Sequence, residues 1–324
     1  DDSLKNKKKR RPSLCGLGPK IKHAFLFNPD SNGMYALDGF FKSLIKEKDS
    51  KVVRIAHYGD SQLEGDRITC YMRNSFQNRF GGAGIGFVPF DDIADNVNFS
   101  RFASPNWIHY TVFHNRYGSG YYGLSGNVYK FSSHAVQIKN ANDGDSDSSA
   151  SKINSDIVYN SATIGFTFRQ NVTYSNVSLM YGRSSSVCNI TAINASTGEK
   201  YFSDTLETTE NFTVRELDIP ASTRSFKLEF SAETSPDFYG LLVDGNNGVQ
   251  VDNYAIRGHS GDGLLLASPG FFSSQIKKMN VKLIIFQYGA NVVPYVTSDK
   301  RCEVMEDMYF KIFSFFKNIA PDVS

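Results

Sequence analysis

The stretch "RIAHYGDSQLEGDR" (residues 54–67) carries an apolar run up to Gly-Asp-Ser and continues at once into a charged segment. The run that leads into it, "VVRI" (52–55), has the β-branched character of a strand buried in a parallel sheet. Beyond it, apolar side chains recur every four residues from Ile68 to Phe80, which predicts a helix. The order strand, sharp turn, helix opens an α/β unit and presents Ser61 at the turn.

Composition limits the classes of function. The chain has 324 residues, of which 40% are hydrophobic, enough for one large or two ordinary domains with their own cores. Its 35 basic and 33 acidic residues lack the basic excess of a nucleic-acid-binding protein, so we expect no nucleic-acid partner. No apolar run reaches the ~18 residues of a membrane-spanning helix, so we expect no transmembrane segment.

The cysteines do not indicate a metal site. They are far apart and have none of the spacings that zinc sites use. Buried free thiols are the favoured interpretation, although one long-range disulfide remains open. The four positions are Cys15, Cys70, Cys188 and Cys302.

The N-terminal segment is strongly basic. Residues 1–22 include the run "KNKKKRRP" without hydrophobic periodicity, which predicts a disordered tail. A localisation or nucleic-acid patch is the alternative.

Between residues 100 and 250 the sequence changes character. It becomes rich in Ser, Thr, Asn, Gly and Tyr, and short alternating runs replace the helical ones. These runs predict antiparallel strands of a β-sandwich. They are "SATIGFTFRQ" (161–170), "NVSLMYG" (176–182), "NITAIN" (189–194), "FTVRELDIP" (212–220), "RSFKLEFSAE" (224–233) and "FYGLLVDG" (238–245).

Two other segments are ambiguous. "NWIHYTVFHNRYGSGYYG" (106–123) could stack its aromatic rings on sugars, or could supply the core and edge of the sandwich. "FGGAGIGF" (80–87) follows a helix rather than a strand, which is wrong for a dinucleotide or phosphate loop. We therefore expect a tight backbone passage beneath the active site.

After residue 250 the α/β character returns, so the sandwich is predicted to be inserted into an α/β domain made of residues 23–99 and 251–324. The apolar run "VKLIIFQYGAN" (281–291) predicts a further strand, and a helical pattern follows it. The chain ends at "APDVS" (320–324), where a helix and Pro-Asp-Val normally approach another buried strand. We expect the C-terminal part of this domain to lie beyond Ser324.

Three separated pieces can form a site. Ser61, Gly258 and Asn291 each follow a predicted strand of the α/β domain, and ligands bind at the carboxyl edge of such sheets. A serine hydroxyl that attacks an ester needs a base and donors for the oxyanion. The backbone N–H groups of Ser61 and Gly258 and the amide of Asn291 are candidate donors.

These pieces resemble a known family. "GDSQLEGD" (59–66), the glycine in "NYAIRGHSG" (253–261) and "YGAN" (288–291) resemble blocks I, II and III of the SGNH (GDSL-type) hydrolases. The longer run from 59 to 89 looks like peptidoglycan O-acetylesterases, whose SGNH domain is also interrupted by a carbohydrate-binding-like β-sandwich. The resemblance implies a flavodoxin-like, three-layer α/β fold built on a parallel sheet.

The resemblance also implies roles for individual residues. Ser61 would be the nucleophile, and Gly258 and Asn291 would be oxyanion donors. Asp60 would hold the nucleophile loop, with Gly289 and His259 in supporting positions.

The histidines depart from the family pattern. The family takes its catalytic Asp and His from a DxxH motif near the C-terminus, but none follows Asn291, and no histidine lies beyond His259. His259 could line the active-site pocket. His57 lies inside a predicted buried strand, so we expect it to be a core histidine. The others have no recognisable spacing: His23, His109, His114 and His134.

The resulting hypothesis is a serine esterase that removes O-acetyl groups from a polysaccharide, with peptidoglycan as first candidate, through an acetyl-serine intermediate. It needs no metal or organic cofactor, and it implies a periplasmic, cell-envelope or secreted location. An O-acetyltransferase on the same fold is a closely related alternative. A non-catalytic glycan-binding protein with a degenerate or truncated hydrolase domain, or an envelope structural protein, is the alternative from another class.

Overall fold

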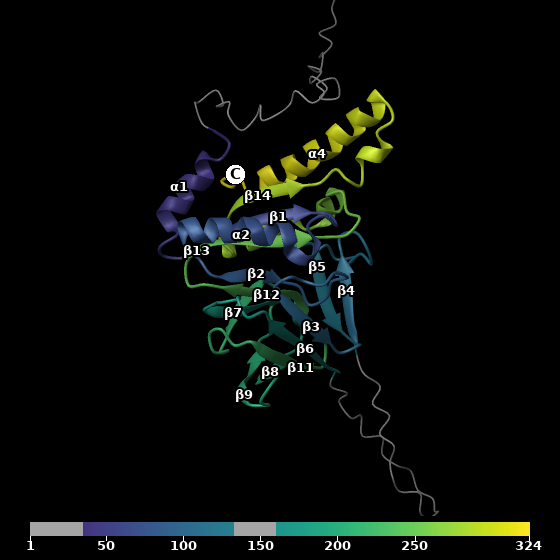
Figure 1. Ribbon diagram of the computed structural model, residues 1–324. Helices are drawn as coiled ribbons and strands as arrows, with labels where there is room; N and C mark the ends of the chain where they lie inside the picture. Colours follow the sequence, from purple (N-terminus) through teal and green to yellow (C-terminus); the bar gives the residue numbers. More distant parts are fainter. Residues whose placement is uncertain (1–34, 133–159) are drawn as a thin grey trace, which may run out of the picture.

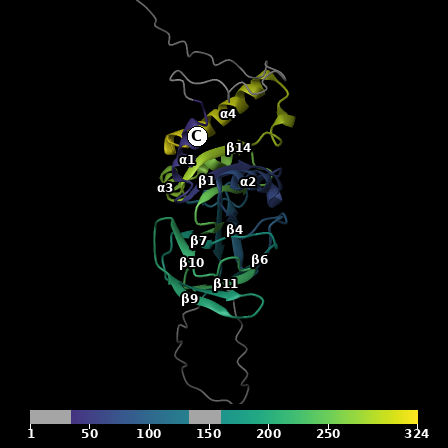
Figure 2. The same cartoon turned by 60° about the vertical axis from the view of Figure 1, so that its left-hand side comes forward.

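The computed structural model describes residues 35–132 and 160–324. The tail predicted for residues 1–22 lies outside the described residues. Two parts are stacked on each other: a small parallel sheet with helices on both faces, and an antiparallel β-sandwich beneath it (Figures 1 and 2).

Three strands form the parallel sheet; β1 and β13 are buried along most of their length, as expected for strands covered on both faces, whereas β14 is mostly half-buried. The middle strand pairs in parallel with both neighbours. In order across the sheet they are β13 (Gly248–Ala255), β1 (Val52–Gly59) and β14 (Val281–Gln287). At the C-terminus, Ser324 exchanges two backbone hydrogen bonds with β14, at Lys282 and Ile284.

Among the described residues, four helices cover this sheet (Figure 1). One apolar cluster joins the first two helices to one face of the sheet, and a second cluster joins the other two helices to the opposite face and to the sandwich. They are α1 (Asp38–Glu47), α2 (Arg67–Phe80), α3 (Pro269–Lys278) and α4 (Asp299–Ile319). Short 3-10 turns lie in the loops: η3 (Glu64–Asp66), η4 (Asp262–Leu266) and η5 (Val293–Tyr295).

The sandwich consists of two antiparallel sheets packed around a phenylalanine-rich core. One sheet has the order β10 (Thr213–Leu217), β7 (Asn176–Gly182), β12 (Asp237–Asp244), β5 (Asn127–Phe131) and β4 (Trp107–Thr111), with β2 (Gly84–Val88) also paired to β12. The other has the order β3 (Phe99–Ala103), β6 (Asn160–Phe168), β11 (Ser225–Ala232), β8 (Cys188–Asn194) and β9 (Lys200–Leu206). The six strands predicted from alternating runs are confirmed.

The predicted fold class is wrong. A flavodoxin-like, three-layer α/β domain was expected to organise the chain, but among the described residues the parallel sheet has three strands. The antiparallel sheets have six and five strands and make up most of the structure. The reason lies in the pairing: the β-branched runs that predict buried parallel strands are few, whereas the numerous alternating segments find antiparallel partners and close a sandwich.

The glycine-rich run after α2 is a strand of the sandwich rather than a loop. The close backbone approach expected there is confirmed: a Cβ on Gly84 would lie 2.1 Å from the Val243 carbonyl oxygen, and one on Gly86 would lie 2.4 Å from Asp252 Oδ1. Both glycines have positive φ. They let β2 pass between β12 and the parallel sheet.

The junction between the two parts contains buried charges. The Arg54 guanidinium on β1 bonds to both carboxylate oxygens of Asp252, at 3.1 and 3.3 Å, and to the carboxylate of Asp244 on β12. Asp252 also accepts the backbone N–H of Phe87, at 3.0 Å. These bonds connect the parallel sheet to the sandwich through paired and satisfied groups.

The expectation that the cysteines are free thiols is only partly met. Cys70 and Cys188 are free thiols, and burial raises the pKa of Cys188 to about 12. Cys302 is disulfide-bonded, so the expectation of free thiols is wrong for this residue. Pairing between cysteines far apart in sequence depends on tertiary proximity, which their spacing does not reveal. Across the described residues, no helix has the length and apolar character needed to cross a membrane.

Candidate active site

The turn at the end of β1 presents an exposed serine. A Cβ on Gly59 would lie 2.5 Å from the Leu63 side chain and 2.9 Å from the Gln287 carbonyl oxygen, so only glycine fits there. The Asp60 side chain is fully buried, and its Oδ1 accepts the backbone N–H of Gln62 at 2.9 Å. This aspartate holds the turn while the side chain of Ser61 faces solvent.

The loop after β13 lies beside this turn. Ile256 donates its N–H to the Gly59 carbonyl at 3.0 Å. Arg257 Nε and Nη2 bond to the two carboxylate oxygens of Glu64, at 2.7 and 2.5 Å. Gly258 follows with φ of 74°, and a Cβ there would lie 3.1 Å from the ring of Phe113. The positive φ favours glycine at this position, and Gly258 is half-buried.

Asn291 connects the loops. Its Nδ2 donates to Asp60 Oδ2 and to the His259 carbonyl oxygen, each at 3.2 Å. One bond reaches the residue before Ser61, and the other reaches the residue after Gly258. Gly289, with φ of 135°, starts the turn that brings Asn291 back to this edge. The three predicted site residues therefore lie on loops that a single amide joins.

This bonding restricts Asn291 in the structure. A side-chain amide has two N–H donors, and both are in use. To donate to an oxyanion, the amide has to release one of the two bonds.

His259 is a buried, neutral part of the loop. Its Nε2 accepts the Gly263 N–H at 3.1 Å, and its Nδ1 lies 3.5 Å from the Tyr288 hydroxyl. Burial lowers the pKa of His259 to about 4, with the nearby Asp262 carboxylate acting in the opposite direction. The His259 side chain has no solvent exposure, and its Nε2 is already hydrogen-bonded. His259 therefore holds its own loop in place.

His57 is confirmed as a core histidine. It is fully buried, and its two ring nitrogens lie 3.1 Å from Thr69 Oγ1 and 3.1 Å from Gln287 Oε1. Burial lowers its pKa. The histidine is satisfied by its neighbours on α2 and β14.

In the part of the chain that the structure describes, no side chain hydrogen-bonds to the Ser61 hydroxyl, and no cluster of three or more His, Cys, Asp or Glu residues has a metal-binding arrangement. The described site is therefore a serine, a glycine backbone and a bridging amide.

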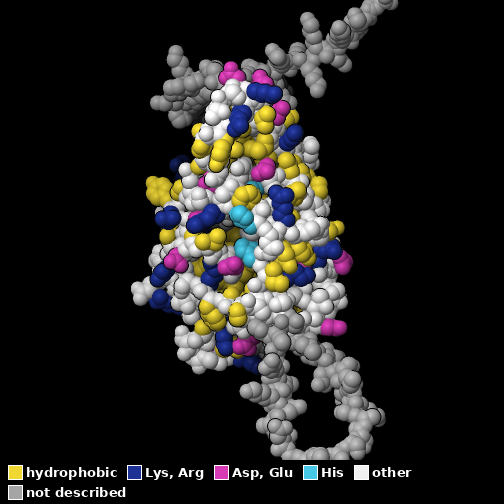
Figure 3. Space-filling model, turned by 90° about the vertical axis from the view of Figure 1, so that its right-hand side faces the viewer, with side chains coloured by type: hydrophobic (Ala, Val, Ile, Leu, Met, Phe, Trp, Pro, Cys, Tyr) yellow, Lys and Arg dark blue, Asp and Glu magenta, His cyan; other side chains and the backbone are white. Residues whose placement is uncertain are grey.

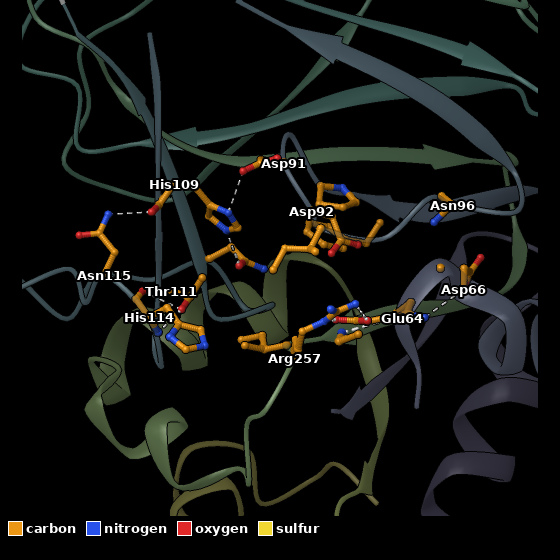
Figure 4. Close-up of a pocket in the computed structure, with 18 residues that line it drawn as sticks. Glu64, Asp66, Asp91, Asp92, Asn96, His109, Thr111, His114, Asn115 and Arg257 are labelled. Atoms are coloured by element: carbon orange, nitrogen blue, oxygen red, sulfur yellow. Dashed lines mark hydrogen bonds and ion pairs between the residues drawn. The ribbon is translucent and has the colours of Figure 1, made fainter. Parts of the chain in front are cut away.

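A cavity of about 150 Å³ lies beside this edge, between the parallel sheet and the sandwich (Figure 4). Figure 3 views the molecule from the right-hand side of Figure 1, and histidine side chains are visible near the middle of that face. The sequence pattern assigned no role to the sandwich residues that line it, among them His109, His114 and Asn115. They lie in the ambiguous aromatic segment, and no spacing marked them.

Much of that aromatic segment belongs to packed interior. Trp107 makes edge-on contacts with the rings of Phe90, Phe131 and Phe230 in the sandwich core. Tyr122 is buried at 1% exposure. For these two residues the core interpretation is confirmed.

Comparison with known proteins gives a structural similarity. No protein-family model matches the chain, and no curated protein matches it by sequence. A family two carbohydrate esterase from Cellvibrio japonicus aligns with a TM-score of 0.19 at 11% identity, over 52% of this chain and 71% of that chain. A family 29 carbohydrate-binding module aligns with a TM-score of 0.27 at 11% identity, over 53% and 95%. These scores are too low to support an argument.

A peptidoglycan O-acetylesterase structure aligns with a TM-score of 0.61 at 16% identity, over 88% of this chain and 70% of that chain. At this identity the likeness concerns the fold. The parallel sheet and the sandwich together have a fold similar to that of a peptidoglycan O-acetylesterase.

Proposed function

We propose that the chain is an SGNH-type serine esterase that removes O-acetyl groups from a polysaccharide, with peptidoglycan as the substrate. The observation that carries the proposal is the Asn291 amide, which bonds to Asp60 and to the His259 carbonyl. It ties the exposed serine turn to the Gly258 loop at the carboxyl edge of a parallel sheet, where ligands of such sheets bind.

In the proposed reaction, the Ser61 hydroxyl attacks the acetyl carbonyl carbon, and the sugar hydroxyl leaves. Water then cleaves the acetyl-serine and releases acetate. The backbone N–H groups of Ser61 and Gly258 would donate to the developing oxyanion. Asn291 would join them after releasing one of its two bonds. Loss of one such donor typically costs about 2.7–4 kcal/mol of transition-state stabilisation.

The nucleophile also needs a base to accept its proton. His259 does not fit this role, because it is buried, neutral and bonded through Nε2 to its own loop. The proposal therefore assigns Ser61, Gly258 and Asn291, keeps Asp60, His259 and Gly289 as positioning residues, and leaves the base unassigned.

The similarity in fold supports the proposed substrate class. The similarity to a peptidoglycan O-acetylesterase supports an acetylated glycan substrate and a periplasmic, cell-envelope or secreted location. An O-acetyltransferase would use the same acetyl-serine and replace water by a sugar hydroxyl in the second step. A non-catalytic glycan-binding protein is the second candidate, favoured by the absence of any hydrogen-bonded base at Ser61 among the described residues.

Hydrolysis of an activated acetate ester by Ser61→Ala tests the proposal. We expect the rate to fall at least about a thousandfold, because removal of a nucleophile eliminates the covalent route. Ser196→Ala, an exposed serine in the sandwich, is the matched control and should keep the parent rate.

Equal rates for the parent chain and Ser61→Ala would contradict the proposal. Absence of any serine-dependent turnover, together with retention on insoluble peptidoglycan, would favour the glycan-binding alternative. Quantifying free acetate against acetylated acceptor sugar separates esterase from acetyltransferase.

A further inference from the structure

The cavity beside the candidate active site is built by both parts of the molecule. Its walls come from η3, from the connection after β2, from β4 and the turn that follows it, and from the end of β13. Its volume is about 150 Å³. That is the scale of one sugar ring rather than of an oligosaccharide.

The cavity lies next to the candidate nucleophile. Glu64, at its base, donates its backbone N–H to the Ser61 carbonyl at 3.3 Å. Arg257 directly precedes Gly258, and the ring of Phe113, beside His114, lies against Gly258. A ligand held in the cavity would therefore be in contact with the loops that carry Ser61 and Gly258.

The polar groups on one wall are fixed in place. His109 has Nδ1 3.4 Å from an Asp91 carboxylate oxygen and Nε2 2.9 Å from Asn127 Oδ1. Asn115 donates from Nδ2 to the His109 carbonyl at 2.8 Å. His114 lies beside them and is exposed (Figure 4). These bonds fix His109 and Asn115 in place, and the exposed His114 ring lies next to them.

Carboxylates form another part of the lining. Arg257 is neutralised by its two bonds to Glu64, and the side chains of Asp91 and Asp92 add negative charge (Figure 4). Burial raises the pKa of Asp92, and Glu64 acts in the same direction. Arg101 acts on both Asp91 and Asp92, so the charged groups around the cavity are largely balanced, and a neutral ligand fits better than a charged one.

Apolar side chains complete the lining. Phe87, Pro89, Ile93 and Ile256 face the same space as the amides, imidazoles and carboxylates. A pyranose ring has hydroxyl groups at its rim and apolar C–H faces, so it matches both kinds of surface. Ligand sites commonly combine such apolar walls with a few fixed polar groups.

We propose that this cavity is a subsite for one neutral sugar ring of the glycan, held by Asp92, His114 and Asn115 beside Ser61. The inference rests on the proposed function for the identity of the ligand as a glycan. It assigns to the sandwich a direct part in substrate binding, because His114 and Asn115 come from the turn after β4.

Calorimetric titration with a tetramer of N-acetylglucosamine tests the subsite. We expect Asp92→Asn and His114→Ala each to weaken binding about tenfold relative to the parent chain. Asp95→Asn is the matched control, because it changes an exposed carboxylate of the same connection that does not line the cavity. Unchanged thermal midpoints would show that the variants are folded.

The titration involves no turnover, so its result is separate from that of the proposed function. Binding that is equal in the parent chain, Asp92→Asn and His114→Ala would overturn the subsite even if Ser61-dependent hydrolysis is found. Weakened binding in both variants would support it even if no hydrolysis is found. A uronic-acid oligosaccharide that binds as tightly as the neutral tetramer would overturn the preference for a neutral ring.

Discussion

The sandwich and the parallel-sheet part bury different chemistry. The sandwich has an apolar core in which rings contact one another, as Phe166 does with Phe226 and Phe230 with Phe238. The parallel-sheet part buries charged and titratable side chains, including Arg54, Arg73, His57 and His259. The candidate site lies on the part that buries these charged and titratable side chains. Burial of apolar area stabilises both parts, but fixed hydrogen bonds hold the loops that carry Ser61, Gly258 and Asn291.

A second buried ion pair also holds a segment near the candidate site in place. Arg73 on α2 bonds through Nη1 and Nη2 to the two carboxylate oxygens of Asp66, at 2.7 and 3.0 Å, and through Nε to the Val251 carbonyl at 2.9 Å. Asp66 has φ of 65° and precedes the helix. The pair therefore fixes the start of α2 against β13, a few residues after Ser61 in the chain.

The largest expected effect is in the junction. Arg54→Met leaves Asp252 and Asp244 buried without their cation, which typically costs about 3–5 kcal/mol of folding free energy. Urea unfolding should show this loss. In the sandwich, Lys227→Met removes an exposed pair with Glu229 and should change stability by no more than about 1 kcal/mol.

Equal losses of folding free energy in Arg54→Met and Lys227→Met would contradict this expectation, because the buried and the exposed ion pair would then contribute equally to stability.

The next effect is a dependence on acid. The pKa of His259 is lowered from an ordinary 6.5 to about 4, so the folded state favours the neutral ring. Its contribution is complete above pH 6.5 and is lost as the pH falls towards 4, a change of roughly 3 kcal/mol. His57, with a pKa lowered in the same direction, adds to this acid sensitivity.

Denaturant midpoints of the parent chain and His259→Gln between pH 7 and pH 4 measure the contribution of His259. The variant should lose less stability over that range, because its side chain does not titrate. A parallel decline in the two proteins would assign the acid sensitivity to other groups.

The smallest effect is in the sandwich core. Ile164→Val removes one methylene group from a fully buried side chain and should cost about 0.5–1.5 kcal/mol. Its effect should be the same at pH 7 and pH 5, because no titratable group is changed. A pH-dependent loss at this position would show that the two parts are coupled more closely than their cores suggest.

Local sequence determined most individual elements of the chain. Alternation predicted strands such as β7 and β11, and four-residue periodicity predicted α2, because each pattern reports which face of one element is buried. The turn at Gly59 and Asp60 was also visible from the sequence, since a small residue and a side-chain acceptor suit a tight connection.

Tertiary structure decided the proportions of the fold and the arrangement of the site. The alternating runs predicted antiparallel strands, but periodicity does not specify partners, so the small size of the parallel sheet and the strand order emerged only in three dimensions. The same holds for the two bonds of the Asn291 amide and for the cavity wall formed by His109 and His114. These contacts join residues far apart in sequence, and their geometry depends on how the sandwich packs against the parallel sheet.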